Sequence, residues 1–271
     1  MAYNPSEYWH ETVKENPMLH VRFEKVIQEP SSTFPVHWHE YWEFLCVTKG
    51  GMKAVVQGRS YALSPGDILV VNSEELHMTI TDQNTDYLLL QINKKHFTGR
   101  STAPLRFENF IFGDKECFKR FCELWEINDN AEDGYPFLFT SKLYDFFYYI
   151  YTHHLAEGSA DITDIKERSR MTELLEWIKD NCMSDLSLNM AAEHLHVSRE
   201  YFCRLFRRYT GQTFLEYLYS LRTIAFYESL KKSDDPIPFL MEKSHLTNYK
   251  VFIRTFKKMY GDTPQSIRKK L

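Results

Sequence analysis

The sequence has no long apolar run, and its first residues do not show the pattern expected of a leader peptide. No stretch of about 18 uninterrupted apolar residues occurs, and the N-terminal MAYNPSEYWHETVKENP lacks a basic start followed by an apolar run. These absences argue against a membrane-spanning helix and against a secretory signal. We therefore expect a cytoplasmic protein with no membrane partner.

Cysteine is scarce, and its spacing offers no pairs. The five cysteines form an odd set with no C-x-x-C pair, which argues against a disulfide framework and a structural zinc knuckle. The chain also offers no nucleophile or separate acid–base pair that would define a catalytic centre. We expect reduced, mostly buried thiols and no enzymatic activity.

The chain is long enough for two domains, and its charge is unevenly distributed. It has 271 residues, of which 43% are hydrophobic. The net charge of −4 divides into 16 Lys and Arg against 12 Asp and Glu from Met171 to Leu271, and 17 against 25 before Met171. A basic C-terminal part is compatible with a polyanion partner, but charge alone is explained as well by solvated helix faces.

An internal repeat occupies the basic part. FCRLFRRYTGQTF (202–214) and FIRTFKKMYGDTP (252–264) align without a gap at an offset of 50 residues, with two phenylalanines, one arginine, the glycine and one threonine identical. A repeat at a fixed offset indicates two copies of one structural unit. Residues 213–233 between the copies have apolar residues at helical spacing, which predicts one long connecting helix.

Each copy predicts a helix-turn-helix unit. In the first copy Ser187 and Ser198 are candidate N-caps, His196–Val197 forms the turn and Gly211 ends the second helix. In the second copy Asn248 or Thr247 is the candidate cap. Burial of the apolar positions leaves outer faces that suit the major groove of DNA. These faces comprise Arg199, Glu200, Cys203, Arg204 and Arg207 in the first copy, and Tyr249, Lys250, Ile253, Arg254 and Lys257 in the second.

The stretch from about Met171 to Arg268 resembles the AraC-type DNA-binding domain. LHVSREYFCRLFRRYTGQTFLEYL, the pair Arg222 and Ala225, and the terminal FIRTFKKMYGDTPQSIR carry the resemblance. By position, it implies base contacts by Arg199, Glu200, Cys203, Arg204, Lys250, Ile253 and Arg254. It implies phosphate contacts, which add affinity and salt dependence, by Arg207, Arg208, Lys257 and Lys258.

The second copy departs from the family pattern in its turn. Many family members have glycine there with alanine four residues earlier, and this chain has His245 and Met241, followed by Leu246 where phenylalanine is usual. We therefore expect the second unit to sit differently or to read bases less specifically.

The N-terminal part predicts an antiparallel β-structure. Short apolar segments alternate with turn residues at intervals of about 8 to 12 residues, which is typical of a sandwich or barrel. Within it, FPVHWHEYWEFL places His37, His39 and Glu43 at positions of equal parity. On one unbroken strand these side chains would face the same side, where two imidazoles and a carboxylate suit a divalent transition metal.

The spacing of these residues resembles a cupin motif. His37-x-His39-x3-Glu43-x6-Gly50 is similar to the first cupin motif, and SPGDILVVNSEELH, ending in His77, occupies the place of the second. Ahead of this DNA-binding domain, both resemble the effector-sensing cupin of AraC-type regulators. The match is incomplete, because Asn72 and Glu74 stand where metal-binding cupins have proline and glycine.

Three interpretations of the set His37, His39, Glu43 and His77 stay open. It could bind a divalent transition metal, recognise a polar small molecule such as a sugar directly, or consist of core histidines satisfied by hydrogen bonds. A sugar site favours nearby aromatic side chains, and Tyr61 is our candidate contact. Trp38 and Trp42, at even positions, are expected to face away from the histidines.

Helical segments at 114–128 and 140–155 follow the strands. The stripe Leu143, Phe146, Phe147, Ile150 and Tyr151 suits packing on the barrel and on a second subunit. The family resemblance implies a homodimer formed through these helices, and a purely intramolecular role is the alternative. The expected divisions are an arm (1–18), a barrel (19–100), a helical segment (101–156), a linker (157–168) and a DNA-binding domain (169–271).

The sequence thus predicts an α+β multidomain protein, with an N-terminal cupin-like antiparallel β-barrel and a C-terminal all-α double helix-turn-helix domain. We expect a regulator that binds promoter DNA under control of a small-molecule effector, a sugar or related carbon source, and that contacts RNA polymerase if it activates. The arm, with Tyr8, Trp9 and His10, is a candidate lid. Two rivals are a metal-dependent cupin enzyme fused to a DNA-binding module and an effector-independent regulator with a scaffold barrel.

Overall fold

The computed structural model describes residues 13–30, 32–97, 105–156 and 162–269. The described residues up to Ala156 form one compact unit, and those from Ile162 onward form another. Tyr8, Trp9 and His10 lie outside the described residues. Among the helices of the described ranges, none combines the length and apolar character needed to cross a bilayer.

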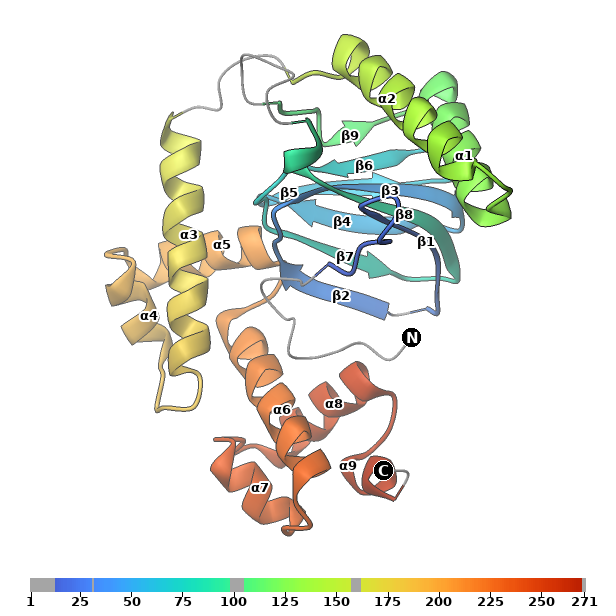
Figure 1. Cartoon of the computed structure of the whole chain (residues 1–271). Helices are drawn as coiled ribbons and strands as arrows, with labels where there is room; N and C mark the ends of the chain where they lie inside the picture. The colour runs from blue at the N-terminus through green and yellow to red at the C-terminus, as the bar shows by residue number, and fades with distance from the viewer. Residues whose placement is uncertain (1–12, 31, 98–104, 157–161, 270–271) are drawn as a thin grey trace. The chain divides into compact units, whose positions relative to one another are not determined.

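The N-terminal unit is a sandwich of two antiparallel sheets (Figure 1). One sheet has the strand order β1-β8-β3-β6-β9 and the other the order β2-β7-β4-β5, which confirms the predicted cupin-like antiparallel fold. The 3-10 helix η2 (Lys94–Phe97) follows β8. The strands are β1 (Val21–Gln28), β2 (Ser32–His37), β3 (Tyr41–Lys49), β4 (Met52–Val56), β5 (Arg59–Leu63), β6 (Ile68–Val71), β7 (His77–Thr81), β8 (Thr85–Asn93) and β9 (Phe110–Ile111).

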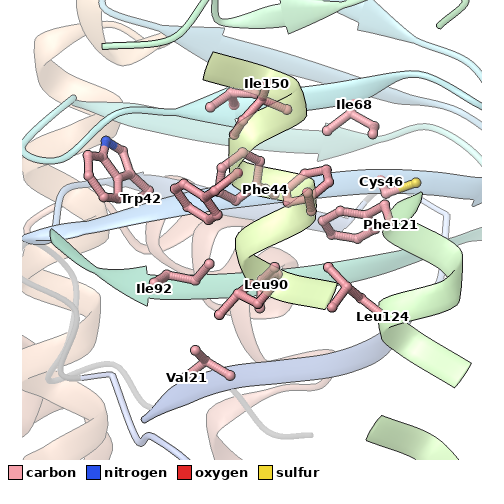
Figure 2. Close-up of a cluster of buried hydrophobic side chains, with 14 of the residues drawn as sticks. Val21, Trp42, Phe44, Cys46, Ile68, Leu90, Ile92, Phe121, Leu124 and Ile150 are labelled. Carbon is pink, nitrogen blue, oxygen red and sulfur yellow. The ribbon is translucent and has the colours of Figure 1, made fainter. Parts of the chain in front are cut away.

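Helices α1 (Lys115–Asn130) and α2 (Tyr135–His153) cover the outer face of the five-stranded sheet. Figure 2 shows Trp42 and Phe44 from β3 packed with Phe121 and Ile150 from the two helices. Strand β3 is buried almost throughout because one of its faces meets the other sheet and the other face meets these helices. Of the predicted helical stripe, only Tyr151 is exposed.

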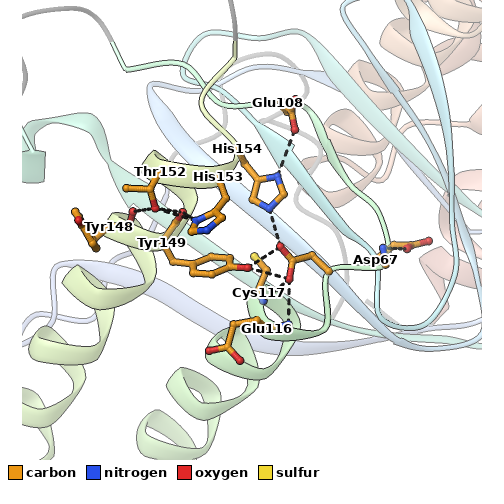
Figure 3. Close-up of polar contacts among 11 residues, drawn as sticks. Asp67, Glu108, Glu116, Cys117, Tyr148, Tyr149, Thr152, His153 and His154 are labelled. Atoms are coloured by element: carbon orange, nitrogen blue, oxygen red, sulfur yellow. Dashed lines mark hydrogen bonds and ion pairs between the residues drawn. The ribbon is translucent and has the colours of Figure 1, made fainter.

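A hydrogen-bonded cluster joins the end of α2 to the start of α1 (Figure 3). Asp114 caps α1 and also accepts hydrogen bonds from Tyr149 Oη at 3.0 Å and His154 Nε2 at 2.8 Å. Burial opposes ionisation of Asp114, but the hydrogen bonds from Cys117 N, His154 and Tyr149 outweigh it and lower the pKa of this carboxyl. The last described residue before the second unit, Ala156, donates its N–H to the carbonyl of Arg106 at 2.9 Å.

The C-terminal unit is all-helical and contains two helix-turn-helix units, which confirms the predicted fold (Figure 1). Its helices are α3 (Ile162–Asn181), α4 (Leu188–His194), α5 (Arg199–Thr210), α6 (Phe214–Lys232), α7 (Ile237–Lys243), α8 (Tyr249–Tyr260) and α9 (Pro264–Arg268). The units are α4–α5 and α7–α8, and α6 connects them. Helix α3 includes residues 162–168, which we had expected in the linker.

Local side-chain chemistry sets the helix ends where the sequence predicts them. Ser187, Ser198 and Asn248 accept hydrogen bonds from backbone N–H groups at the starts of α4, α5 and α8. Gly211 ends α5 in the left-handed conformation, with φ of 69°. Asn248, and not the alternative Thr247, is therefore the cap of the second recognition helix.

Both turns contain a histidine in the left-handed region, which usually favours glycine. His196 has φ of 53° and His245 has φ of 51°. In each turn the next N–H reaches back to the first helix, from Val197 to Ala192 O at 3.1 Å and from Leu246 to Met241 O at 2.9 Å. The second turn therefore keeps the geometry of the first despite its departure from the family pattern. It is longer by one residue, with five residues between its helices instead of four.

One buried side chain connects the two helix-turn-helix units. Arg222 of α6 is 8% exposed. Its Nε donates to Cys182 O at 2.8 Å and its Nη2 to Ser184 O at 2.8 Å, both between α3 and α4. Its Nη1 donates to His245 O at 3.0 Å, in the turn of the second unit. Arg222 therefore fixes the second turn against the start of the first unit.

The substitution Arg222→Met should destabilise the C-terminal unit. Methionine keeps the apolar stem but leaves three carbonyls without their donor, so we expect a loss of about 2–4 kcal/mol in the free energy of unfolding. Urea unfolding of the full chain, followed by circular dichroism, measures it. The free energy of unfolding of Arg222→Lys should lie between those of the starting protein and Arg222→Met. That of Arg199→Met, at an exposed arginine of α5, should stay within about 0.5 kcal/mol of the starting protein. Equal stability of the Arg222→Met and Arg199→Met variants would contradict this role.

Candidate functional site

The predicted histidine–carboxylate set lies where the chain crosses from one sheet to the other. Strand β2 ends at His37 and β3 begins at Tyr41, so these residues do not lie on one unbroken strand, which was the condition for their shared facing. His37 pairs with His77 of β7 in the four-stranded sheet, and Glu43 pairs with Gln91 of β8 in the five-stranded sheet. The side chains still converge, because they approach the interior from opposite sheets.

The geometry of the set fits a metal ion. One ligand atom from each of His37, His39, Glu43 and His77 can be chosen so that all four lie within 4.8 Å of one another. Each residue is at most 4% exposed. A tetrahedral ion with bonds of about 2.1 Å has its ligand atoms about 3.4 Å apart, so a small contraction would complete the coordination. The cluster could therefore hold a divalent transition metal.

Backbone carbonyls orient two of the imidazoles. His39 Nδ1 lies 3.2 Å from Tyr41 O, and His77 Nδ1 lies 2.9 Å from Glu75 O. Since a carbonyl only accepts, each Nδ1 carries the proton, and each Nε2 points to the carboxylate of Glu43, at 3.0 Å for His39 and 3.5 Å for His77. Hydrogen bonding at the outer nitrogen is typical of metal-binding histidines.

Glu43 is the charged centre of the cluster. Burial opposes its ionisation, but the charge of His77 and the hydrogen bond with His39 outweigh burial and hold the pKa of Glu43 well below its usual range. Gln91 Nε2 donates to the same carboxylate at 2.6 Å, and Arg22 Nη1 donates to Gln91 Oε1 at 3.2 Å. Gln91 and Arg22 carry no signal in the sequence that would assign them to this site, because only the pairing of β1, β8 and β3 places them beside Glu43.

The departures from the second cupin motif have structural reasons. Glu74 has φ of 68°, so this position keeps a left-handed backbone although it lacks glycine. Asn72 forms two hydrogen bonds with the backbone of Phe107, at 2.8 and 3.0 Å. The buried carboxylate of Glu75 accepts from Asn109 Nδ2 at 2.6 Å and pairs with Arg106. These contacts fasten the segment 105–109 beside the residues that precede His77.

The aromatic candidates separate into different surroundings. Trp42 is buried beneath α2, as its parity predicts, and its ring lies 5.7 Å from that of Phe147. Tyr61 packs at the apolar part of the interior, with its ring 5.7 Å from that of Phe110. Tyr41 lies beside the cluster instead, with its ring 6.1 Å from that of His39 and its hydroxyl 2.6 Å from Glu15 Oε1. Tyr61 as an effector contact stays a prediction.

The predicted DNA-binding residues lie on two recognition helices. On α5 and α8 all of them are exposed except Ile253, which is half-buried and packs on the core of the second unit. The exposed residues are Arg199, Glu200, Cys203, Arg204, Arg207, Arg208, Lys250, Arg254, Lys257 and Lys258. Arg208 differs from the others because it forms an ion pair with Glu167 of α3. Contact of these residues with DNA stays a prediction.

Two family models match the two units in the predicted order. The AraC-like ligand binding domain matches residues 23–97, and a helix-turn-helix domain matches residues 191–270.

Similar curated proteins include regulators that align over the whole chain or over its C-terminal part. The transcriptional activator RhaS of Pectobacterium carotovorum is 22% identical over 259 residues, which cover 88% of this chain and 89% of RhaS. The multiple antibiotic resistance protein MarA of Salmonella typhimurium is 32% identical over 95 residues, which cover 35% of this chain and 75% of MarA. Among solved structures, ToxT from Vibrio cholerae aligns with a TM-score of 0.40 at 14% identity, over 93% of this chain and 99% of ToxT.

The sandwich and the double helix-turn-helix thus correspond to a ligand-binding domain and a DNA-binding domain in one chain. Their combination belongs to regulators and not to enzymes, so the rival interpretation as a cupin enzyme is not supported. The chain is a DNA-binding transcription regulator and belongs to the AraC family.

Proposed function

We propose that the protein regulates a promoter in response to a ligand held by His37, His39, Glu43 and His77, and that this ligand is a divalent transition metal ion. The observation that carries the proposal is the convergence of four buried ligand atoms within 4.8 Å of one another. This spacing suits an ion better than a sugar, because a sugar ring needs a cavity several times larger between the same side chains. The metal interpretation therefore takes precedence over direct contact with a sugar.

Binding at this cluster would act on the corner between the two sheets. A bound divalent ion would supply positive charge opposite the ionised Glu43. His37 and His77 belong to the four-stranded sheet and Glu43 to the five-stranded sheet, so an occupied site would resist their separation. A ligand shifts an equilibrium only by its different affinity for two states, so the occupied sandwich must favour one DNA-binding state of the chain.

A sugar or related carbon source is the second candidate effector. Gln91, Arg22 and Glu24 extend the polar part of the interior next to Glu43, and Arg22 Nη2 also contacts Glu24. Amide, guanidinium and carboxylate groups of this kind are suited to hydroxyl groups of a ligand. An effector-independent scaffold is less well supported, because a buried polar cluster contributes less to stability than apolar packing would.

The exposed arginines and lysines of α5 and α8 support a promoter as the partner. We assign base contacts to Arg199, Arg204 and their neighbours on α5, and phosphate contacts mainly to Arg207, Lys257 and Lys258. One similar regulator is called a transcriptional activator. By analogy this chain would activate transcription and contact RNA polymerase.

An exposed aromatic stripe on α2 supports a homodimer. Phe137, Tyr148 and Tyr151 are 85%, 68% and 44% exposed. Tyr148 follows Phe137 by about three turns and Tyr151 follows it by about four turns. The three side chains therefore share one face of the helix, opposite the face that packs on the sheet. Pairing of this face with a second copy would bury it and would provide two DNA-binding domains for two half-sites.

Cobalt binding tests the metal site. Purified full-length protein, stripped of metal, should bind one Co²⁺ per chain. Binding should produce the visible absorption bands of a four-coordinate site and raise the melting temperature. Glu43→Gln and His77→Asn should abolish both signals, whereas His153→Asn, at an exposed histidine of α2, should retain them. If the unaltered protein binds no Co²⁺, the metal proposal fails, and a thermal-shift screen of sugars and sugar acids then tests the second candidate.

Salt dependence separates base contacts from phosphate contacts. The preferred duplex is first selected from a random pool, and binding is then measured by fluorescence anisotropy. Arg204→Glu should relax base preference, whereas the double variant Lys257→Ala/Lys258→Ala should weaken binding to all sequences. The double variant should also flatten the slope of log K against log salt by about 0.9 per lost contact. Lys232→Ala, at an exposed lysine at the end of α6, is the control. Unaltered binding in both test variants would exclude the assigned DNA faces.

Tyr148→Glu tests the dimer. A charge in the middle of an apolar interface should raise the dimer dissociation constant at least tenfold. Sedimentation equilibrium of the full chain measures it. Phe239→Glu makes an equal change at an exposed aromatic of α7 and should leave association unchanged. A monomeric starting protein, or a dimer equally strong in both variants, would rule out this interface.

A further inference from the structure

Arg208 is placed differently from the other cations of its recognition helix. The family resemblance assigns it a phosphate contact, yet its Nη2 pairs with Oε1 of Glu167. The Arg208 side chain remains 51% exposed, and the Glu167 side chain is 24% exposed. The pair is therefore partly sheltered but lies within reach of an approaching duplex.

The same carboxylate receives two further side chains of α5. Tyr209 Oη donates to Glu167 Oε1 at 2.9 Å, and Tyr201 Oη donates to Glu167 Oε2 at 3.2 Å. Glu167 thus collects three donors from one helix, at positions two turns apart. An exposed ion pair alone contributes little, but a carboxylate with three donors holds its arginine in a defined orientation.

The electrostatics agree with this arrangement. Burial tends to lower the pKa of Arg208, but the charge of Glu167 outweighs it and raises that pKa. Burial and the hydrogen bond to Glu167 raise the pKa of Tyr209 to about 12. Both shifts are those expected around an ionised carboxylate.

We propose that Glu167 is a negative determinant of DNA affinity, because its carboxylate competes with a DNA phosphate for Arg208. A carboxylate and a phosphate use the same donor fork of an arginine. While Arg208 is bound to Glu167, the duplex gains no phosphate contact from it. If Arg208 turns to the duplex, Glu167 loses its cation and faces a phosphate of the same charge.

The position of Glu167 in the chain gives this competition a use. Glu167 belongs to α3, the first described helix after the ligand-binding unit. A change in how the first turns of α3 lie against α5 would therefore alter DNA affinity without touching a base-reading residue. The proposal does not depend on the identity of the ligand in the sandwich.

The test compares Glu167→Gln with the starting protein in full-length form. Glutamine keeps the size, and its amide oxygen can still accept from one of the two tyrosine hydroxyls, but it lacks the charge that holds Arg208. On a duplex of arbitrary sequence, we expect about fivefold tighter binding near 0.1 M salt and a slope of log K against log salt steeper by about 0.9, as for one added phosphate contact. Glu167→Ala should act in the same direction and serves as the second variant if glutamine disturbs folding.

Two controls separate competition from general repulsion. Glu173→Gln removes the same charge from α3, where Glu173 accepts from Ser169, and should change affinity much less. In an Arg208→Gln background, Glu167→Gln should produce no gain, because the competing group is absent.

Three outcomes would overturn the proposal: unchanged affinity and slope in Glu167→Gln, a gain that persists in the Arg208→Gln background, or weaker binding. The last would mean that Glu167 supports the DNA-binding form of α5. Circular dichroism at the assay temperature confirms that each variant is folded.

Discussion

The ligand-binding unit depends on the compensation of one buried charge. A carboxylate between two sheets is costly unless polar partners surround it. Glu43 forms hydrogen bonds with His39 and Gln91 and an ion pair with His77, and these partners come from three different segments of the chain. These donors fix the meeting point of β2, β3, β7 and β8 more specifically than apolar contacts could. A separate apolar cluster, which includes Leu45 and Tyr87, packs without such partners. The contacts that compensate the charge of Glu43 therefore also help to define the register of the strands that meet there.

Much of the C-terminal unit could be predicted from the sequence because its determinants are local. Caps such as Ser198 and Asn248, the terminator Gly211 and the buried phenylalanines act within one or two turns of the chain. The repeat shows the same pattern of apolar, basic and terminating residues a second time, which supports the prediction independently. The role of Arg222 could not be predicted in this way, because its three acceptors lie 23 to 40 residues away in the chain.

The N-terminal site was predicted in its residues but not in its construction. Equal parity brought His37, His39 and Glu43 together on paper, and the same three converge in the fold, although the strand breaks between them. Parity cannot distinguish one continuous strand from a crossing between two sheets. Gln91 of β8 was missed for the same reason, since cross-strand neighbours depend on register, which the sequence does not display. Arg208 likewise matched the family position, and only the fold shows its partner on α3.

Glu75 connects two parts of the ligand-binding unit through its backbone and its side chain. Its carbonyl orients His77 inside the sandwich, while its carboxylate holds Arg106 and Asn109. The carbonyl of Arg106 in turn receives the N–H of Ala156, the last described residue of the unit. Glu75 therefore contacts His77 on one side and Arg106 and Asn109 on the other, so a shift of this one residue would alter both sets of contacts. A chain of contacts through Glu75 and Arg106 thus connects the interior of the sandwich to the backbone at Ala156.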